Sequence, residues 1–429
     1  YCRVDVGAQN DPATDEFPAS RGIVCGAHNF AEGDLVVVAL PGTVLPGDFA
    51  IAARKTYGHV SDGMICAEDE LGLGDDHSGI IVLAPGFAEP GADAVELLWT
   101  ADEVLDIDVM PDLSNCLSLR GLAREAAIAN GVSYEDRYRA KLPEPADGGY
   151  PIVLDSERCS AFVALTIDGI DPAAPTPDWM AQRLRASGVR SISLAVDVTN
   201  YVMLESGQPL HAYDGATLAG PIRVRLAEAG ERLTTLDGQD RVLDADDLLI
   251  TDDSGPIGLA GVMGGENTEV SETTTTIVLE AAHFDGATVS RTFRRHGLPS
   301  EASKRFERGV DPQLPYAAAK RAAKLLVAHG GGQVTAETVV GSAPAPHRVS
   351  LRSGLISAVL GTKVEQERTM RLLAAAGIEV TALGDSLTVT APAERGDGVE
   401  PCDVVEEVGR HVGYDAIGLS LPVPKETRG

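Results

Sequence analysis

Short apolar runs separated by glycine and proline characterise the first 100 residues of the chain. The clearest run is Leu35 to Leu40, and further runs occur at Ile51 and at Ile80 to Leu83. Apolar runs of this length between turn residues are typical of β-strands. Because many short strands with glycine turns suit a small closed barrel, we predict a β-barrel here.

Helical periodicity and strand-like alternation then follow one another from about Val153 to Gly332, which predicts a larger mixed α+β region. Thr176 can cap a helix that places Met180 and Leu184 on one face. Residues 222–226 alternate like a strand. Farther on, 365–376 predicts an amphipathic helix, 387–391 a strand, and a last helix begins near 403.

A proline- and glycine-rich linker, residues 138–149, separates the start of the chain from this region. At 429 residues the chain is too long for one hydrophobic core, so we expect several domains. The predicted segments are 1–100, 101–150, 151–345 and 346–429. The fold class that they define is multidomain α+β.

Charge limits the kinds of partner. The chain has 35 basic and 64 acidic residues, a formal charge of -29. A field of this sign repels nucleic acid except where basic groups are clustered locally. Any RNA contact must therefore come from a local basic patch, and the most positive stretch runs from Arg291 to Arg308.

No membrane or disulfide chemistry is expected. The longest uninterrupted apolar run, Leu35 to Leu40, is far shorter than a membrane span. The six cysteines are scattered without CxxC spacing, which argues against zinc knuckles and a secreted disulfide framework. Since the chain starts at Tyr1 with neither a charged leader nor an apolar signal core, we interpret it as cytoplasmic and truncated at its start.

The stretch that organises the candidate chemistry is VDVTNYVMLESGQPLHAYD, residues 196–214. It places Thr199 and Asn200 on a helix-like piece and His211 just after a Gly-Gln-Pro turn. Hydroxyl, amide and imidazole groups brought together in this way suit a pocket that holds a polar ligand and positions a water. A buried helix with polar caps is the alternative that the stretch alone leaves open.

Several strings follow one another in the order found in one family. They are VDVTNYVMLESGQPLHAYD, LDGQ, GVMGG, VLEAAHFD and EASKRFERGVDP. Through them the chain resembles the beta subunit of bacterial phenylalanyl-tRNA synthetase, and residues 151–345 resemble its editing domain. The resemblance covers essentially the whole chain, which stops before the family's catalytic-like and anticodon-contacting parts.

The resemblance assigns roles to individual residues. It implies that Glu280 reads the hydroxyl of a tyrosyl group and that His211 sits near the ester, as the catalytic pair. Thr199 and Asn200 would hold the polar end of the amino acid, and Gly264 would bring backbone close to the ligand. A core histidine and a strand-end carboxylate facing water are the alternatives for the catalytic pair.

Resemblance also refines the predicted architecture. VCGAHNF and VALPGTVLPGDFAI, among other strings, look like the OB-type tRNA-binding module of that family. The expected fold is therefore an N-terminal OB-type barrel, a partial connecting domain, a mixed α+β editing domain and a small C-terminal α/β domain of winged type. A structural or weakly contacting role for the acidic barrel is the alternative.

A basic patch near the editing motifs is the candidate RNA contact. It contains Arg291, Arg294, Arg295 and Arg305, which can guide the acceptor end of a transfer RNA to the pocket. A solvated helix face with internal salt bridges is the alternative.

Acidic residues near the C-terminus are the candidate metal ligands. Asp403, Glu406 and Glu407 stand at helical spacing, and Asp397 lies six residues upstream of the first. Hard oxygen ligands from a loop and a helix suit Mg²⁺, and the family has acidic ligands in a matching pattern. Glu394 replaces a tryptophan that is usual in the family. The alternative is an acidic first turn favoured by the helix dipole.

The function that follows from the resemblance is the beta subunit of a phenylalanine-tRNA ligase. Its alpha subunit would activate phenylalanine with ATP in an alpha2-beta2 assembly that acts on tRNA-Phe, while this chain would hydrolyse mischarged Tyr-tRNA-Phe. Consistent with that division, the chain has no GxxxxGK[ST] phosphate loop. A non-catalytic RNA-binding and assembly module and a metal-dependent hydrolase are the rivals.

Overall fold

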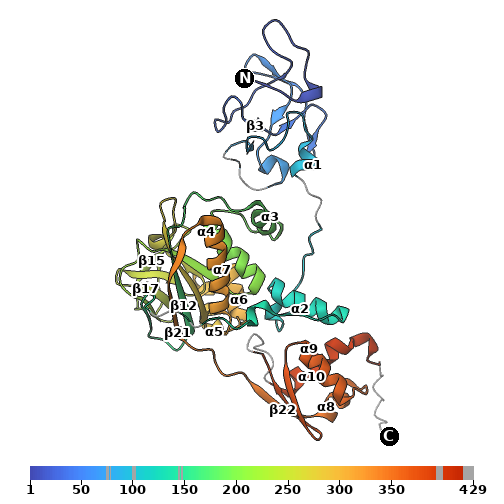
Figure 1. Cartoon of the computed structure of the whole chain (residues 1–429), viewed down its shortest axis with the longest axis vertical. Coiled ribbons are helices and arrows are strands. Elements are labelled where there is room, and N and C mark those ends of the chain that lie inside the picture. Colours follow the sequence, from blue (N-terminus) through green and yellow to red (C-terminus); the bar gives the residue numbers. More distant parts are fainter. Residues whose placement is uncertain are drawn as a thin grey trace, which may run out of the picture. The chain divides into compact units, whose positions relative to one another are not determined.

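The computed structural model describes residues 1–73, 77, 79–98, 103–143, 145, 148–392 and 400–418. The chain divides into two compact units, Tyr1–Leu105 and Asp106–Gly429 (Figure 1). Each unit has hydrophobic clusters of its own. Among the helices of the described residues, none is long and apolar enough to span a bilayer.

Short antiparallel strand pairs, one short α-helix and two 3-10 helices make up the described part of the first unit. The pairs are β1–β2, β3–β10, β4–β9, β5–β6 and β7–β8. The elements are β1 (Cys2–Val4), β2 (Arg21–Ile23), β3 (Leu35–Val36), β4 (Val38–Ala39), β5 (Val44–Leu45), β6 (Phe49–Ala50), β7 (Arg54–Thr56), β8 (His59–Ser61), β9 (Met64–Ile65), β10 (Val82–Leu83) and α1 (Ala94–Leu98).

The described part of this unit contains no closed barrel, which corrects the prediction from the sequence. Its pairs stay separate two-stranded ladders. The run Leu35 to Leu40 is interrupted at Val37, so that β3 pairs with β10 while β4 pairs with β9. Strands of two or three residues have too few ladder hydrogen bonds to join into a continuous wall.

The second unit contains the larger sheets, one of four and one of five strands. Their orders are β13-β20-β12-β21 and β11-β14-β17-β18-β19. The strands are β11 (Ile152–Leu154), β12 (Cys159–Asp168), β13 (Leu210–Asp214), β14 (Ile222–Leu226), β17 (Leu248–Asp252), β18 (Gly255–Leu259), β19 (Met263–Gly264), β20 (Thr276–Phe284) and β21 (Gln333–Gly341), and a separate hairpin is formed by β15 (Arg232–Thr234) and β16 (Asp240–Val242).

Helices surround these sheets. They are α2 (Leu119–Asn130), α3 (Asp178–Ala186), α4 (Leu194–Ser206), α5 (Gly286–His296), α6 (Glu301–Arg308) and α7 (Pro315–Gly330). The predicted face of α3 is confirmed, because Met180 and Leu184 are fully buried. Just before α7, Asp311 forms a turn in which its carboxylate accepts from the Gln313 amide.

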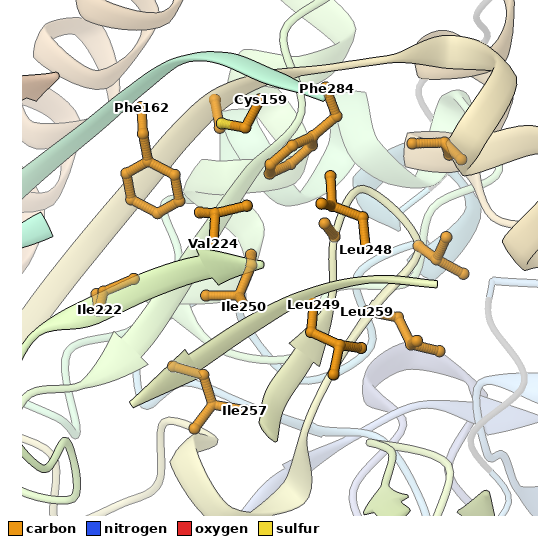
Figure 2. Packing of buried hydrophobic residues seen from close by; sticks show 14 of the residues in the cluster. Cys159, Phe162, Ile222, Val224, Leu248, Leu249, Ile250, Ile257, Leu259 and Phe284 are labelled. Atoms are coloured by element: carbon orange, nitrogen blue, oxygen red, sulfur yellow. The ribbon is translucent and has the colours of Figure 1, made fainter. Parts of the chain in front are cut away.

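The two faces of the four-stranded sheet pack on different layers. Strand alternation sends Leu165 and Ala212 to one face, where they form a core with α4 and α7. The other face carries Phe162 and Tyr213, which pack against the five-stranded sheet. Figure 2 shows part of this second core, in which Ile250 and Phe284 lie among other buried apolar side chains.

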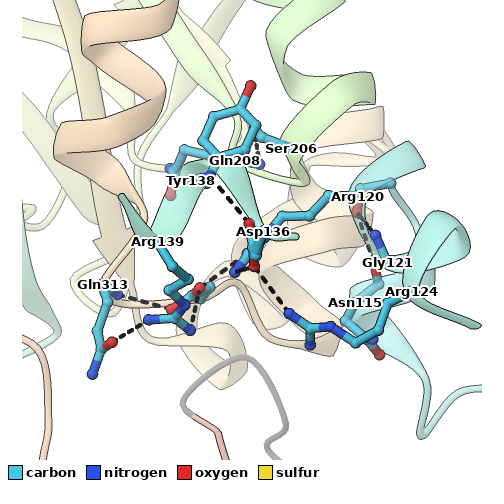
Figure 3. A network of polar contacts seen from close by, with 12 residues as sticks. Asn115, Arg120, Gly121, Arg124, Asp136, Tyr138, Arg139, Ser206, Gln208 and Gln313 are labelled. Carbon is cyan, nitrogen blue, oxygen red and sulfur yellow. Dashed lines mark hydrogen bonds and ion pairs between the residues drawn. The ribbon is translucent and has the colours of Figure 1, made fainter. Parts of the chain in front are cut away.

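A buried network of charges attaches α2 to this region (Figure 3). The Asp136 carboxylate accepts from Arg120 and from Arg124 Nη2, the latter at 2.9 Å. Arg120 Nη1 and Arg139 Nη2 each donate to Asp311 at 3.0 Å. Burial raises the pKa of Asp136, but the Arg120 guanidinium outweighs this and holds that pKa below its usual range. Breaking such a buried network typically costs about 3–5 kcal/mol.

The C-terminal part has a small core of its own within the second unit. Its three-stranded sheet has the order β22-β24-β23 and packs with three helices. The elements are β22 (Arg348–Arg352), α8 (Ser353–Leu360), α9 (Gln366–Ala375), β23 (Glu379–Leu383), β24 (Ser386–Thr390) and α10 (Pro401–Val412). The predictions of a helix at 365–376, a strand at 387–391 and a helix near 403 are confirmed.

Candidate functional site

The turn between α4 and β13 places His211 opposite Glu280. Gly207 ends α4 in the left-handed region, with a φ of 89° that favours glycine. Gln208 is fully buried, and its Nε2 donates to the carbonyls of Pro209 and Ala282, each at 2.9 Å. This side chain connects the turn to β20. His211 on β13 is the direct cross-strand partner of Glu280 on β20. The side chains of such partners stand next to each other on one face of the sheet.

His211 and Glu280 line the same pocket. It encloses roughly 450 Å³ of empty space, part of which lies at its open mouth. The other lining residues, apart from Tyr213, carry no ionisable group; they are Pro209, Leu210, Ile250, Gly258, Leu259, Gly261, Val262, Met263, Gly264, Phe284, Ala302 and Phe306.

Glu280 is a buried acid rather than a strand-end carboxylate facing water. It lies in the middle of β20 and is only 6% exposed. Its Oε2 accepts a short hydrogen bond from the Tyr213 hydroxyl. Burial raises the pKa of Glu280 to about 7, although the Tyr213 hydrogen bond opposes this rise. Near neutral pH the carboxyl can therefore be present in either protonation state.

His211 is an imidazole held in its neutral form. Burial lowers the pKa of His211 to about 4. Its Nε2 is buried and has no hydrogen-bond partner within the described part of the chain. The ring packs edge-on against Tyr213, with ring centroids 4.6 Å apart. A neutral imidazole with an unused nitrogen can orient a water or accept a proton from it.

Gly264 brings backbone against the imidazole, and its predicted approach to a ligand stays a prediction. A Cβ at this position would lie 2.6 Å from His211 Cε1 and 2.8 Å from its Nε2. Contacts this short do not occur between real side chains, so residue 264 has to be glycine unless the ring moves. The neighbouring Gly261 has a φ of 70° and abuts Phe306 on the same wall of the pocket.

The structure does not bring Thr199 and Asn200 into the lining of this pocket. Both lie on α4, which packs on the Ala212 face of the sheet. Thr199 Oγ1 donates to the Val196 carbonyl at 2.7 Å, one turn back in the helix. A role for these two residues in holding the polar end of a ligand stays a prediction.

The predicted basic patch separates into exposed and internally paired residues. Arg305 is 5% exposed and donates to Leu117 O and to Glu301. Arg295 is bound to the buried Asp247 carboxylate. Arg291 and Arg294 remain exposed on α5. Arg295 is also exposed on α5, but its guanidinium is bound to Asp247, so Arg291 and Arg294 fit a surface contact better.

A second pair of interactions limits the charge of that surface. Arg294 forms an ion pair with Glu307 of α6. Arg291 Nη2 donates to Thr288 Oγ1 at 3.2 Å within its own helix. The guanidinium of Arg291 therefore keeps more of its positive charge available to a ligand than that of Arg294.

The acidic residues of α10 do not gather as one ligand set. Asp403 accepts from the Glu400 amide at 2.8 Å in a helix-capping box, and Glu406 accepts from Tyr414. Glu407 is 1% exposed and accepts from Arg410 and His411 at 2.8 and 2.7 Å. The predicted ligand Asp397 lies outside the described residues.

The grouping of possible metal ligands seen in the described chain is a different one. It consists of Glu125, Glu407 and His411. Arg410 already forms ion pairs with both carboxylates of this group. The group is thus an ion-pair contact between α2 and α10, and Glu407 is the predicted magnesium ligand that fits least.

Tyr213 is the site residue that sequence reasoning missed. It stands two positions after His211, and alternation along a strand sends positions i and i+2 to the same face. The strand assignment of residues 210–214 would therefore have placed the Tyr213 phenol beside the imidazole. The motif that contains this tyrosine does not by itself mark the phenol as a functional group.

Comparison with known proteins defines the class to which this fold and pocket belong. Three family models match in order: a putative tRNA binding domain at residues 1–93, a B3/4 domain at 158–331 and a tRNA synthetase B5 domain at 349–414. The pocket lies entirely within the B3/4 match. These are domains of an aminoacyl-tRNA synthetase subunit.

Curated relatives make the assignment specific. The phenylalanine–tRNA ligase beta subunit of Cutibacterium acnes (strain DSM 16379 / KPA171202) is 53% identical over 431 residues, covering 98% of this chain and 51% of the relative. That of Thermobifida fusca (strain YX) is 54% identical, covering 100% and 51%. The chain belongs to the family of phenylalanine–tRNA ligase beta subunits, and it spans about half the length of the curated relatives it matches.

A solved structure is also similar. It is an N-terminal fragment of the phenylalanyl-tRNA synthetase beta subunit from Pyrococcus horikoshii, with 15% identity and a TM-score of 0.36. The match covers 71% of this chain and 85% of that one. At this TM-score the likeness carries no argument about the fold.

Proposed function

We propose that this chain hydrolyses tRNA-Phe mischarged with tyrosine. The observation that carries the proposal is a buried carboxylate and a neutral imidazole facing one otherwise apolar pocket. The carboxylate suits recognition of a phenol, and the imidazole suits positioning of a water beside an ester. Membership of the beta-subunit family supports this function.

Physical chemistry explains why the synthetase needs such a site. An apolar pocket built for phenylalanine rejects an added hydroxyl only roughly a hundredfold. A separate pocket can select tyrosine positively, because its phenol donates to Glu280. The phenylalanyl ring has no donor for this carboxylate, so its binding desolvates Glu280 without a new hydrogen bond.

His211 is the residue that acts on the reacting atoms. With its pKa at about 4 the imidazole is neutral at physiological pH, so Nε2 can accept a hydrogen bond from the attacking water. The water attacks the ester carbonyl carbon, the ester bond to the terminal ribose breaks, and the ribose oxygen takes a proton. Gly264 leaves the space beside the imidazole that this arrangement needs.

The whole assembly is inferred from the names of the relatives. As a beta subunit, the chain would join an alpha subunit in an alpha2-beta2 tetramer of the cytoplasm that aminoacylates tRNA-Phe. ATP and Mg²⁺ would serve phenylalanine activation on the alpha subunit. The match to phenylalanine–tRNA ligase beta subunits along this chain supports these partners and this ligase activity.

The finer architecture is also a proposal. We assign residues 1–100 to a tRNA-binding module, 101–150 to a partial connecting domain, 151–345 to the editing domain and 346–429 to a winged-type domain. The order of the three family matches supports this division.

The proposal of a magnesium site in the C-terminal domain rests on the chemistry of its carboxylates. Asp403 and Glu406, together with Asp397, would supply the hard oxygens that Mg²⁺ prefers. Such an ion would neutralise the excess negative charge of α10. Glu407 would have to leave Arg410 and His411 to take part, so we do not expect it to be a ligand.

The exposed arginines of α5 are the proposed contact for the acceptor end of the tRNA. Arg291→Glu is expected to raise the KM for tyrosyl-tRNA about threefold and to weaken its salt dependence, because one phosphate contact is lost. Arg185→Glu is the control, since Arg185 is equally exposed but lies on α3, which packs on the other face of the sheet. Measurement of KM at several salt concentrations tests this. Equal effects of Arg291→Glu and Arg185→Glu would refute the proposed tRNA contact at α5.

The function itself is tested by deacylation. Incubated with tyrosyl-tRNA-Phe, the chain should release tyrosine well above the rate in buffer. Folded protein that adds nothing to the buffer rate would leave only a scaffolding role.

A further inference from the structure

The phenol-recognising carboxylate already holds a phenol of the protein itself. Tyr213 is 1% exposed, and its hydroxyl donates to Oε2 of Glu280. Both side chains line the pocket beside His211. Each stands on the same face of the sheet, with Tyr213 diagonal to Glu280 across the β13–β20 ladder.

The hydrogen bond determines which part of the carboxylate is available. One oxygen of Glu280 is engaged by Tyr213, and no hydrogen bond of Oε1 is seen among the described residues. A carboxylate with one donor fixed in place also loses its freedom to rotate in an apolar cavity. The free oxygen is therefore the acceptor that an incoming phenol can reach.

Few other charged groups act on this pair. His211 and Tyr213 face Glu280 from β13, and Ala164 is its partner on β12. Burial and then the Glu280 charge raise the pKa of Cys159, which lies at the start of β12. Asp252 of β17 acts on Tyr213. The pKa of Tyr213 is raised well above its usual value by burial and then by the Glu280 charge, so the phenol stays protonated and can only be the donor. The five-stranded sheet and α6 offer the pocket apolar and glycine residues.

We propose that Tyr213 is a positioning residue for substrate selection: by holding Oε2 of Glu280 it presents Oε1 as the single acceptor for the substrate's phenol. The inference rests on the proposed editing function and deepens it. It implies that the pocket distinguishes ligands by one hydroxyl at one place, rather than by the general polarity of a carboxyl group.

Removal of the Tyr213 hydroxyl should change both recognition and its pH dependence. The ionised carboxylate is the better acceptor for a phenol, so preference for tyrosyl esters should rise with pH as Glu280 ionises. The Tyr213 hydrogen bond lowers the pKa of Glu280 from where burial alone would put it. Without this bond, ionisation and the rise in preference should both move to higher pH.

The test uses Tyr213→Phe in the full chain, with tyrosyl- and phenylalanyl-tRNA-Phe from pH 5.5 to 8.5. Near pH 7 we expect the preference for the tyrosyl ester to fall roughly threefold to tenfold, as for one lost hydrogen bond. The loss should appear mainly in KM, and the midpoint of the pH profile should rise by about one unit. The ring itself is retained, so its contact with the imidazole is preserved.

Tyr138→Phe is the matched control. Tyr138 also donates to a carboxylate, Glu205 Oε2 at 2.7 Å, but it packs with the α4 and α7 core and not with the pocket. The control should leave preference and pH profile as in the parent. An effect of equal size in both variants would mean that only stability had changed and would overturn the proposal.

A second readout separates failure of this inference from failure of the proposed function. Carboxyl ¹³C NMR of glutamate-labelled protein reports ionisation of Glu280 without any substrate; Glu280→Gln assigns the signal. An upward shift of its titration in Tyr213→Phe supports the positioning role even in protein that does not deacylate. An unchanged titration overturns the role even in protein that edits.

Discussion

Glu280→Ala is expected to reduce the preference for tyrosyl over phenylalanyl esters by about tenfold to a hundredfold. The parent offers a buried acceptor that only the tyrosyl group can use, and a site of this kind discriminates strongly because the hydrogen bond is made in an apolar cavity. Without the carboxylate the two esters present nearly the same apolar ring to the pocket. Paired rate measurements on the two charged tRNAs check this, and equal preference in variant and parent would contradict the recognition role.

Glu280→Gln separates charge from shape. The amide keeps the size of the side chain and an oxygen that can accept from Tyr213, so this variant should retain part of the preference. The parent's pKa of about 7 lies above that of an unfolded glutamate, so the folded state binds more protons between these two values and loses stability as pH rises. Glu280→Gln should therefore gain stability relative to the parent between about pH 4 and 8. Thermal unfolding at several pH values measures this difference.

Gly264→Ala is expected to slow hydrolysis of the tyrosyl ester by about a hundredfold. Its Cβ would fall 2.6 Å from His211 Cε1, so the imidazole must move away from the place where it orients the water. A displacement of about 1 Å in a catalytic group can have an effect of this size. The loss should appear in kcat for both esters, because His211 acts on the bond and not on the side chain of the substrate.

Gly354→Ala provides the matched control for that change. Gly354 lies in α8, and a Cβ there meets nothing within 4 Å. The control should therefore keep parental activity and equal or greater stability, since alanine favours a helix. If Gly264→Ala were as active as its control while remaining folded, the contact between residue 264 and the imidazole would have no part in catalysis.

Local elements were well predicted from the sequence because their signals are local. The apolar face of α3 and the alternation of β14 indicated the type and place of these elements. The predicted cap Thr176 is wrong, because the N-cap of α3 is Pro177 and the Thr176 hydroxyl donates to Asp197. The predicted closed barrel is wrong, because apolar runs between glycines specify strands without specifying how they pair. Leu35 to Leu40 looks continuous in sequence, yet it divides between two ladders.

The candidate site was predictable where the family resemblance assigns its residues and not where it depends on packing. His211, Glu280 and Gly264 share the pocket as expected. The Tyr213 hydrogen bond depends on a register between β13 and β20, which lie about 70 residues apart in the chain, and no sequence pattern specifies that register. Charge spacing is compatible with the pairs Glu301–Arg305 and Glu407–Arg410 within their helices, but it does not show that Arg305 and Glu407 are buried.

The most direct measurement is the ratio of single-turnover deacylation rates on tyrosyl- and phenylalanyl-tRNA-Phe for the unmodified chain at pH 8. At this pH most of the Glu280 carboxyl is ionised and His211 is neutral. If the pocket binds a phenol through its buried carboxylate, the tyrosyl ester should be hydrolysed about tenfold or more faster than the phenylalanyl ester. Equal rates on the two esters would contradict recognition of the phenol by Glu280.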